Sequence, residues 1–339
     1  MKSQENKQKL SQSVLRWAVF SLFISVLLMG VKWAAYAVTS SSAVLSDALE
    51  SGVNVLTSSF VLFAVWLASR PRDQDHPYGH GKVEFFSSGF EGALILFAAL
   101  SIAVVAIART FDPVTLENLE LGMAIQVVVS VLTFASGQLL IHQGKKLSSP
   151  SLVADGIHIR ADAITTVGTL IGVFAVWITG ALWLDTAVAL VVAIWLGWSG
   201  VKVVRVAVGG LMDEADPEVL QRIARTLQEN RREGWLAPHH TKVMQLGQSI
   251  HIDLHMVFPA YWTIERVHDD SKQMEKVFQQ EFGERTEVML HMESCTSQSC
   301  SYCCMEDCPI RQHEFVKKLT WDSALITAPH RAKPIQEDD

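Results

Sequence analysis

The sequence predicts a membrane bundle of six transmembrane helices followed by a small α+β domain. Hydrophobic residues make up 49% of the 339 residues and charged residues only 19%, against about 25% in an average soluble domain. Six apolar stretches are each long enough to cross about 30 Å of hydrocarbon as a helix. Most of the charged residues and all five cysteines come after residue 211. We therefore expect a transmembrane domain at 1–211, a soluble domain at 212–294 and a cysteine-rich tail at 295–339.

The six apolar stretches are expected to form helices near residues 14–38, 43–69, 84–108, 119–143, 152–179 and 182–206. Basic residues set their orientation, because short loops rich in Lys and Arg stay in the cytoplasm. With a cytoplasmic N-terminus, that side carries Lys2, Lys7, Lys9, Arg16, Arg70, Arg72, Lys82, Lys145, Lys146, Lys202 and Arg205. The opposite side carries Arg109 alone. We therefore expect a multi-pass protein of a bacterial inner membrane with both termini in the cytoplasm.

The soluble half shows two kinds of periodicity. Helical spacing of apolar residues predicts helices at 217–233 and 263–282, and alternation predicts strands at 241–246, 249–258 and 286–293. The order helix, strand, strand, helix, strand predicts one helical layer over one sheet. Residues 309–339 have weak periodicity, and we expect them to be poorly ordered.

Two of the expected membrane helices carry matched pairs of polar residues. Glu50 and Asn54 are four residues apart on the second helix, and His158 and Asp162 are four apart on the fifth, so each pair shares a helix face. Ionisable groups are costly in a bilayer unless they have partners or line a polar cavity. Interhelical hydrogen bonding is the alternative for any one of them. Three oxygens and one imidazole nitrogen suit a divalent metal such as Zn²⁺, Fe²⁺ or Co²⁺.

The loop between the second and third helices offers a further set of ligands. Asp73, His76 and His80 lie within a short polar stretch that also contains Gly79 and Gly81. These three side chains are candidates for binding a second ion at the cytoplasmic surface. The alternative is a solvated turn in which the glycines serve the backbone.

Three motifs resemble those of the cation diffusion facilitator family. They are Ser46-Asp47-Ala48-Leu49-Glu50-Ser51, His76-Pro77-Tyr78-Gly79-His80-Gly81-Lys82, and Ala154-Asp155-x-x-His158-x-x-x-Asp162. The resemblance covers residues 10–294. It implies a homodimer in the lipid bilayer whose cytoplasmic domain is ferredoxin-like, with the order αββαβ. It also implies export of a divalent metal from the cytoplasm in exchange for protons.

The resemblance also implies which residues bind metal. The transport site corresponds to Glu50, Asn54, His158 and Asp162, and the loop site to Asp73, His76 and His80. In the cytoplasmic domain it implies a further metal site at His239, Asp253, His268, His291 and Glu293. Zn²⁺ or another divalent transition metal is then both the substrate and a regulatory ligand.

The chain departs from the family pattern at two positions of the transport site. Family members usually carry Asp or His at position 50 and Asp at position 54, where this chain has Glu50 and Asn54. Asn is a neutral ligand that cannot take up a proton. The leading hypothesis is a divalent metal/proton antiporter for Zn²⁺ or Fe²⁺, and the alternative is a metal-sensing or scaffold protein that does not transport.

The cysteines lie together directly after the last predicted strand, at Cys295, Cys300, Cys303, Cys304 and Cys308. Cytoplasmic thiols stay reduced, and soft thiolates bind Zn²⁺, Cu⁺ or iron–sulfur clusters. The spacing of the five matches no cluster motif closely, and a flexible, redox-sensitive tail is the alternative. We expect neither an enzyme nor a nucleic-acid binder, since no nucleophile–base set is visible and the net charge is −7.

Overall fold

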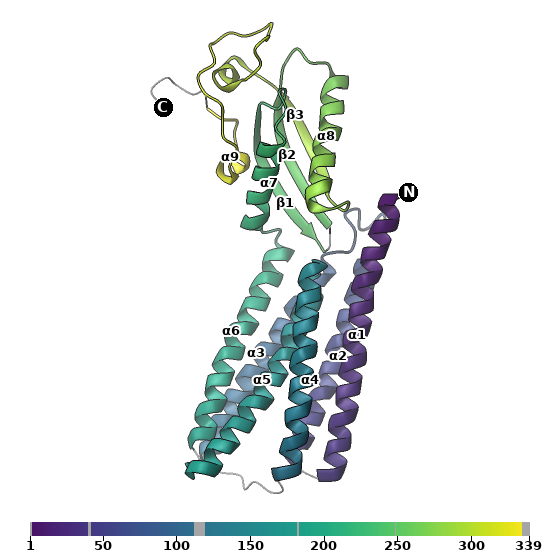
Figure 1. The fold of residues 1–339 in the computed structure, drawn as a ribbon, viewed down its shortest axis with the longest axis vertical. Coiled ribbons are helices and arrows are strands. Elements are labelled where there is room, and N and C mark those ends of the chain that lie inside the picture. Colours follow the sequence, from purple (N-terminus) through teal and green to yellow (C-terminus); the bar gives the residue numbers. More distant parts are fainter. Residues whose placement is uncertain (1, 40–41, 112–118, 182, 248, 334–339) are drawn as a thin grey trace. The chain divides into compact units, whose positions relative to one another are not determined.

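The computed structural model describes residues 2–39, 42–111, 119–181, 183–247 and 249–333. Among these residues, six helices are long and apolar enough to cross a membrane, which confirms the predicted bundle (Figure 1). They are α1 (Lys2–Thr39), α2 (Ser42–Ala68), α3 (Val83–Phe111), α4 (Leu119–Lys146), α5 (Pro150–Thr179) and α6 (Trp183–Leu211).

Helix α5 occupies the middle of the bundle, because it contacts α2, α3, α4 and α6. Glycines allow the closest of these approaches. A Cβ atom added to Gly156 would lie 2.8 Å from the carbonyl oxygen of Gly137 on α4, which is too close for any other residue. Small residues at helix contacts are the usual way for membrane helices to pack closely. Three polar residues of α5, Asp155, His158 and Asp162, are buried in the bundle.

The C-terminal domain has the predicted αββαβ order. It contains α7 (Pro217–Glu229), β1 (Ala237–Leu246), β2 (Ser249–Phe258), α8 (Ile264–Phe282) and β3 (Glu287–Ser294). The sheet order is β1-β2-β3; β1 and β2 are antiparallel, whereas β2 and β3 are parallel and are connected through α8. Apolar side chains of α7 and α8 pack with Ile252 and Leu254 of β2 in the main core of this domain.

Strand β1 begins four residues earlier than predicted, at Ala237. Its register with β2 shifts between His239 and Lys242, and His240 adopts a left-handed φ of 50°. Such a bulge interrupts the alternation of side chains, which is why the alternating pattern predicted only the second half of the strand. The first half pairs His239 with His255 of β2.

The prediction that residues 309–339 are poorly ordered is wrong for the part that the structure describes, up to residue 333. This segment contains a short helix, α9 (Ser323–Thr327), and is preceded by a 3₁₀ helix, η1 (Ser297–Tyr302). Trp321 and Ile326 are buried in the core of the domain. The Arg231 guanidinium donates a hydrogen bond to the Leu319 carbonyl and lies 4.2 Å above the centre of the Trp321 ring. These are tertiary contacts, and they leave no periodic signature in the sequence.

Candidate metal sites

Three polar side chains from α2 and α5 meet inside the membrane bundle. Asn54, His158 and Asp162 are all buried. The Asn54 side-chain N–H donates a hydrogen bond to the Asp162 carboxylate, and Asn54 Oδ1 lies 3.1 Å from His158 Nε2. Three of the four residues in the two predicted pairs, all except Glu50, therefore lie in one cluster.

A fourth buried group, Glu91 of α3, completes this cluster. Its carboxylate oxygen Oε2 lies 3.4 Å from His158 Nδ1, and its side chain is fully buried. Neither carboxylate oxygen accepts a hydrogen bond from any residue that the structure describes. The sequence analysis missed Glu91, although an acidic residue within an apolar span is itself a signal of function.

The other acidic residues of α2 and α5 have different surroundings. Glu50 is exposed in the single chain and lies close enough to His158 for an electrostatic interaction. Asp155 is fully buried and accepts hydrogen bonds from Ser21 of α1 and, at 3.2 Å, from Ser58 of α2. Asp155 therefore ties α1, α2 and α5 together, which is the structural role that interhelical hydrogen bonds usually have.

The α2–α3 loop brings together its three predicted ligands. The carboxylate of Asp73 lies 3.0 Å from His76 Nδ1 and 3.4 Å from His80 Nε2. Hydrogen bonds from the ring and the backbone of His76 hold the pKa of Asp73 below its usual value, so the carboxylate is ionised at neutral pH. One atom from each residue lies within 4.8 Å of the other two, a spacing that a single metal ion can bridge.

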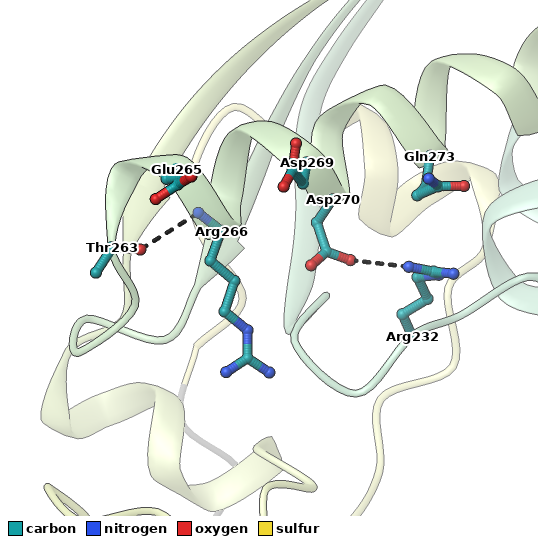
Figure 2. A pocket seen from close by; sticks show the side chains of 7 residues that line it. All are labelled: Arg232, Thr263, Glu265, Arg266, Asp269, Asp270 and Gln273. Atoms are coloured by element: carbon teal, nitrogen blue, oxygen red, sulfur yellow. Dashed lines mark hydrogen bonds and ion pairs between the residues drawn. The ribbon is translucent and has the colours of Figure 1, made fainter.

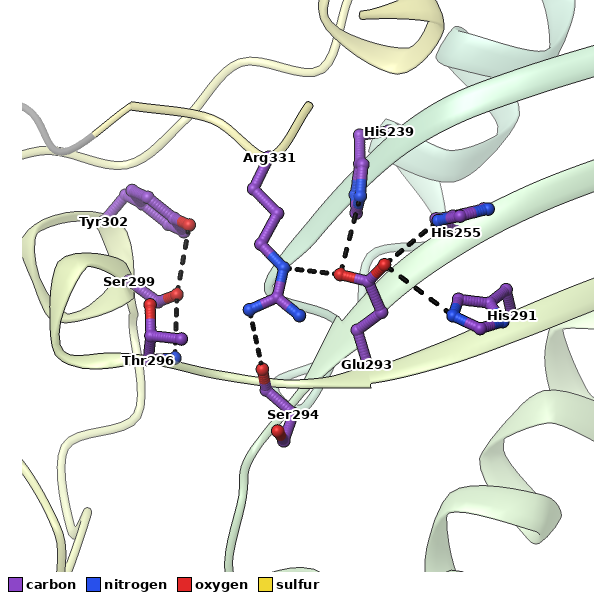
Figure 3. Close-up of polar contacts among 9 residues, drawn as sticks. All are labelled: His239, His255, His291, Glu293, Ser294, Thr296, Ser299, Tyr302 and Arg331. Atoms are coloured by element: carbon purple, nitrogen blue, oxygen red, sulfur yellow. Dashed lines mark hydrogen bonds and ion pairs between the residues drawn. The ribbon is translucent and has the colours of Figure 1, made fainter. Parts of the chain in front are cut away.

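In the cytoplasmic domain, ligands converge at the end of the sheet where β1, β2 and β3 carry histidines (Figure 3). The Glu293 carboxylate lies 3.0 Å from His255 Nδ1, 3.6 Å from His239 Nε2 and 3.8 Å from His291 Nε2. We call His239, His255, His291 and Glu293 the sheet cluster. Burial lowers the pKa of His239 and so favours the neutral imidazole that binds metals.

Arg331 from the C-terminal segment contacts the sheet cluster. Its guanidinium donates a hydrogen bond to the Glu293 carboxylate and another, at 3.0 Å, to the Ser294 carbonyl (Figure 3). Burial alone would raise the pKa of Glu293, but the hydrogen bonds from Arg331 and His255 hold this pKa below its usual value. Glu293 is therefore an anionic centre shared by three histidines and one arginine.

The sheet cluster differs in composition from the predicted set. It contains the three predicted residues His239, His291 and Glu293, and adds His255. Among the residues that the structure describes, Asp253 instead pairs with His251, at 3.0 Å. His239, His255 and Glu293 lie close enough together to bind one ion, and neither His291 nor His268 on α8 belongs to that group of three. The alternation of His251, Asp253 and His255 along β2 places all three on one face, so the sequence contained a signal for His255.

Two cavities of the C-terminal domain contain the remaining candidate ligands. Cys295, Cys300, Cys303 and Cys308 line one cavity, whereas Cys304 does not. A larger pocket of about 340 Å³ lies at the start of α8 (Figure 2). There the Arg232 guanidinium lies 3.3 Å from Asp270, and Arg266 lies above the Trp262 ring. These arginines offset the carboxylates of the pocket, which makes it a poor cation site.

Two family models match the chain and together cover most of it. The cation efflux transmembrane domain matches residues 18–212, and the cation efflux protein cytoplasmic domain matches residues 215–295. The first match alone spans more than half of the 339 residues.

Curated proteins from several bacteria are similar over most of their length. An uncharacterised transporter of Synechocystis sp. is 36% identical over 75% of this chain and 82% of the relative. The manganese efflux system protein MneP of Bacillus subtilis is 24% identical over 84% of this chain and 97% of the relative. The cation-efflux pump FieF of Shewanella oneidensis is 26% identical over 73% of this chain and 83% of the relative.

Proposed function

Because this chain belongs to the cation diffusion facilitator family of divalent-metal efflux proteins, we propose that it exports Zn²⁺ or Fe²⁺ from the cytoplasm in exchange for protons. In this proposal the protein works as a homodimer in a bacterial inner membrane, with both termini in the cytoplasm. The match to the family's cytoplasmic dimerisation domain supports the homodimer. The manganese relative makes Mn²⁺ a third substrate to test.

One observation carries the proposal: Asn54, His158 and Asp162 lie together inside the bundle with the Glu91 carboxylate beside them. One imidazole, one amide and two carboxylates buried together inside a membrane bundle are costly, and such groups usually mark an ion or substrate pathway. The same set supplies nitrogen and oxygen donors to a divalent transition metal. We assign Asn54, His158 and Asp162 as ligands, with Glu50 on the preceding turn of α2.

Proton exchange follows from the chemistry of these donors. An imidazole binds metal only when it is deprotonated, and carboxylates likewise exchange a proton for a cation. Metal binding from the cytoplasm therefore releases protons from the site, and protons arriving from the other side displace the metal. Asn54 takes no part in this exchange, so His158 and the carboxylates carry it.

The other two clusters suit regulatory metal. Asp73, His76 and His80 are exposed or partly exposed in a loop, and the sheet cluster joins three strands of the soluble domain. Metal at the sheet cluster would stabilise the folded domain by mass action. We propose that metal occupancy of these clusters reports the cytoplasmic concentration of the substrate to the membrane domain.

The alternative is a metal-sensing or scaffold protein that binds metal without moving it. The replacement of a carboxylate by Asn54 favours this alternative, because it removes one group that can exchange protons. Purified protein in sealed vesicles with an acidic interior distinguishes the two. The antiporter accumulates Zn²⁺, Fe²⁺ or Mn²⁺ inside, and loses this accumulation when an ionophore collapses the pH gradient. A sensor binds metal but leaves the vesicle interior empty, and that result would reject transport.

A further inference from the structure

Four of the five cysteines line a single cavity of about 200 Å³. Cys295 directly follows β3, Cys300 lies in η1, and Cys303 and Cys308 lie in the loop after η1. The side chains of Cys300 and Cys303 are buried, and none of the five cysteines forms a disulfide. Cys304 is the exception in this segment, because its thiol lies outside the cavity, 3.9 Å from the Tyr302 carbonyl.

Hydrogen bonds that do not use the thiols hold this loop in place. The Arg311 guanidinium donates to the carbonyl oxygens of Cys303 at 3.0 Å, Met305 at 2.6 Å and Cys300 at 3.3 Å. The Cys295 backbone N–H donates to the Phe258 carbonyl at 2.8 Å. The cavity is therefore a built site whose sulfur atoms remain available to a ligand.

Two further features favour an anionic sulfur-ligated centre. The backbone N–H of Ala260 donates to Cys295 Sγ at 3.3 Å, and hydrogen bonds of this kind tune iron–sulfur clusters. The positive charge of Arg311 lies in the lining of the cavity. Four thiolates around Zn²⁺, or around the doubly positive core of an iron–sulfur cluster, leave a net charge of about −2. A neighbouring guanidinium stabilises that negative charge.

The spacing of the sulfurs distinguishes a cluster from a single ion. Zinc binds thiolates at about 2.3 Å in a tetrahedron, so the sulfurs of a four-cysteine zinc site lie about 3.8 Å apart. Among the five cysteines, all of which the structure describes, no three sulfurs lie within 4.8 Å of one another. Thiolates that bind different irons of one cluster need this wider separation.

The sequence pattern agrees once Cys304 is set aside. The four cavity cysteines follow Cys-x₄-Cys-x₂-Cys with a fourth cysteine downstream, which is the spacing of plant-type ferredoxins. We propose that Cys295, Cys300, Cys303 and Cys308 bind an iron–sulfur cluster. The occupancy of this site would depend on the supply of iron and sulfide. One of its ligands, Cys295, follows Glu293 of the sheet cluster by two residues.

Chemical analysis of the full-length protein tests this proposal. The protein is purified in detergent without oxygen, incubated with ferric iron and sulfide, and freed of excess reagents. We expect iron and acid-labile sulfide in equal amounts, with visible absorption that is partly bleached when a chemical reductant is added. Cys300→Ser and Cys303→Ser should each lose at least about tenfold in bound sulfide, and the matched control Cys304→Ser should retain it.

Several outcomes would overturn the proposal. Bound zinc without sulfide in the wild-type protein would make this a single-ion site, and five titratable thiols without metal would make it a tail of reduced cysteines. Loss of sulfide from Cys304→Ser equal to that from Cys303→Ser would reject the assignment of ligands. If a variant fails to fold, the sulfide content of the wild-type protein still shows whether a cluster binds. Sulfide does not bind at the proposed transport site, so this result does not depend on whether the protein transports metal.

Discussion

Asn54 is the residue at which this chain differs most informatively from its family. Its two amide atoms have different partners, because Nδ2 donates to Asp162 while Oδ1 faces His158. An amide can orient a carboxylate and an imidazole at once without adding charge. In the proposed site Asn54 therefore contacts both Asp162 and His158 without adding a charge.

The variant Asn54→Asp should tighten metal binding and make it more pH-dependent. It adds a carboxylate close to Asp162 and Glu91, and like charges this close cannot all remain ionised in the empty site. Metal must then displace an extra proton, so we expect a lower apparent KM, a steeper dependence on pH and a maximal rate that is unchanged or reduced. Metal titration of the purified variant at two pH values measures this. Identical affinity to wild type at both pH values would show that Asn54 is not a ligand.

Glu91 should contribute charge to the same site. Its carboxylate is fully buried and lies 3.4 Å from His158 Nδ1, so replacing it removes an anion that a bound cation would otherwise face. We expect Glu91→Gln to weaken metal binding by about tenfold or more, the effect of losing a partner of a metal ligand, and Glu91→Asp to restore part of it. Metal affinity of both variants that matches wild type would exclude Glu91 from the site.

Arg331 should compete with metal for Glu293. The guanidinium donates to this carboxylate at the centre of the sheet cluster, and a metal there would have to share or displace that contact. We expect Arg331→Gln to tighten metal binding by the soluble domain, measured by calorimetry. Arg225→Gln, on an exposed part of α7, is the control for the loss of one positive charge. Equal affinities in the two variants would mean that Arg331 does not compete.

At the scale of elements, the sheet cluster ties together three strands. His239 comes from β1, His255 from β2 and Glu293 from β3, so bound metal links the whole width of the sheet. The bulge at His240 shifts the register next to this point. Metal that binds only the folded domain stabilises it by about 2.7 kcal/mol at a concentration one hundred times the Kd.

A fragment of residues 213–339 should therefore melt at a higher temperature when metal is added. Substituting His239→Ala and His255→Ala together should remove most of this shift, because these two imidazoles and Glu293 lie close enough together to bind one ion. His313→Ala, in the exposed part of the tail, is the matched control. A shift that survives the double substitution would place the metal at the cysteines or at another site.

The sequence predicts the elements well because hydropathy and alternation encode burial directly. Six apolar runs gave six helices, and the αββαβ order followed from periodicity. The beginning of β1 was missed because the bulge at His240 breaks the alternation, and the order of the tail was missed because it depends on Trp321 and Ile326 entering the core.

The candidate sites depend more strongly on contacts between distant segments. Helical spacing placed Asn54, His158 and Asp162 on facing surfaces, since i,i+4 pairs share a face. It could not show that Glu91 of α3 lies beside them, because that contact depends on how the helices pack. In the same way, alternation along β2 indicates which face His255 occupies, but only the pairing of β1 with β2 places it beside His239.

At the scale of the whole molecule, the chain divides into two compact units, each of which contains two of the candidate metal sites. The membrane unit holds the proposed substrate site and the loop cluster of Asp73, His76 and His80. The soluble unit holds the sheet cluster and the cysteine cavity. In the proposed mechanism the soluble unit binds metal from the cytoplasm and regulates transport, and the membrane unit moves the metal across the membrane. Substitutions in the soluble clusters should therefore change the metal concentration that activates transport, whereas substitutions in the bundle should remove transport itself.

The most direct test of this account is metal uptake by His158→Ala in sealed vesicles with an acidic interior. His158 contacts both Asn54 and Glu91, and it is the site's one imidazole. His142→Ala, an exposed histidine of α4, is the matched control. The account predicts that His158→Ala folds and inserts normally but loses uptake by more than about tenfold, the scale of damage to a metal site, while His142→Ala keeps it. Wild-type uptake by correctly folded His158→Ala would contradict the assignment of the transport site.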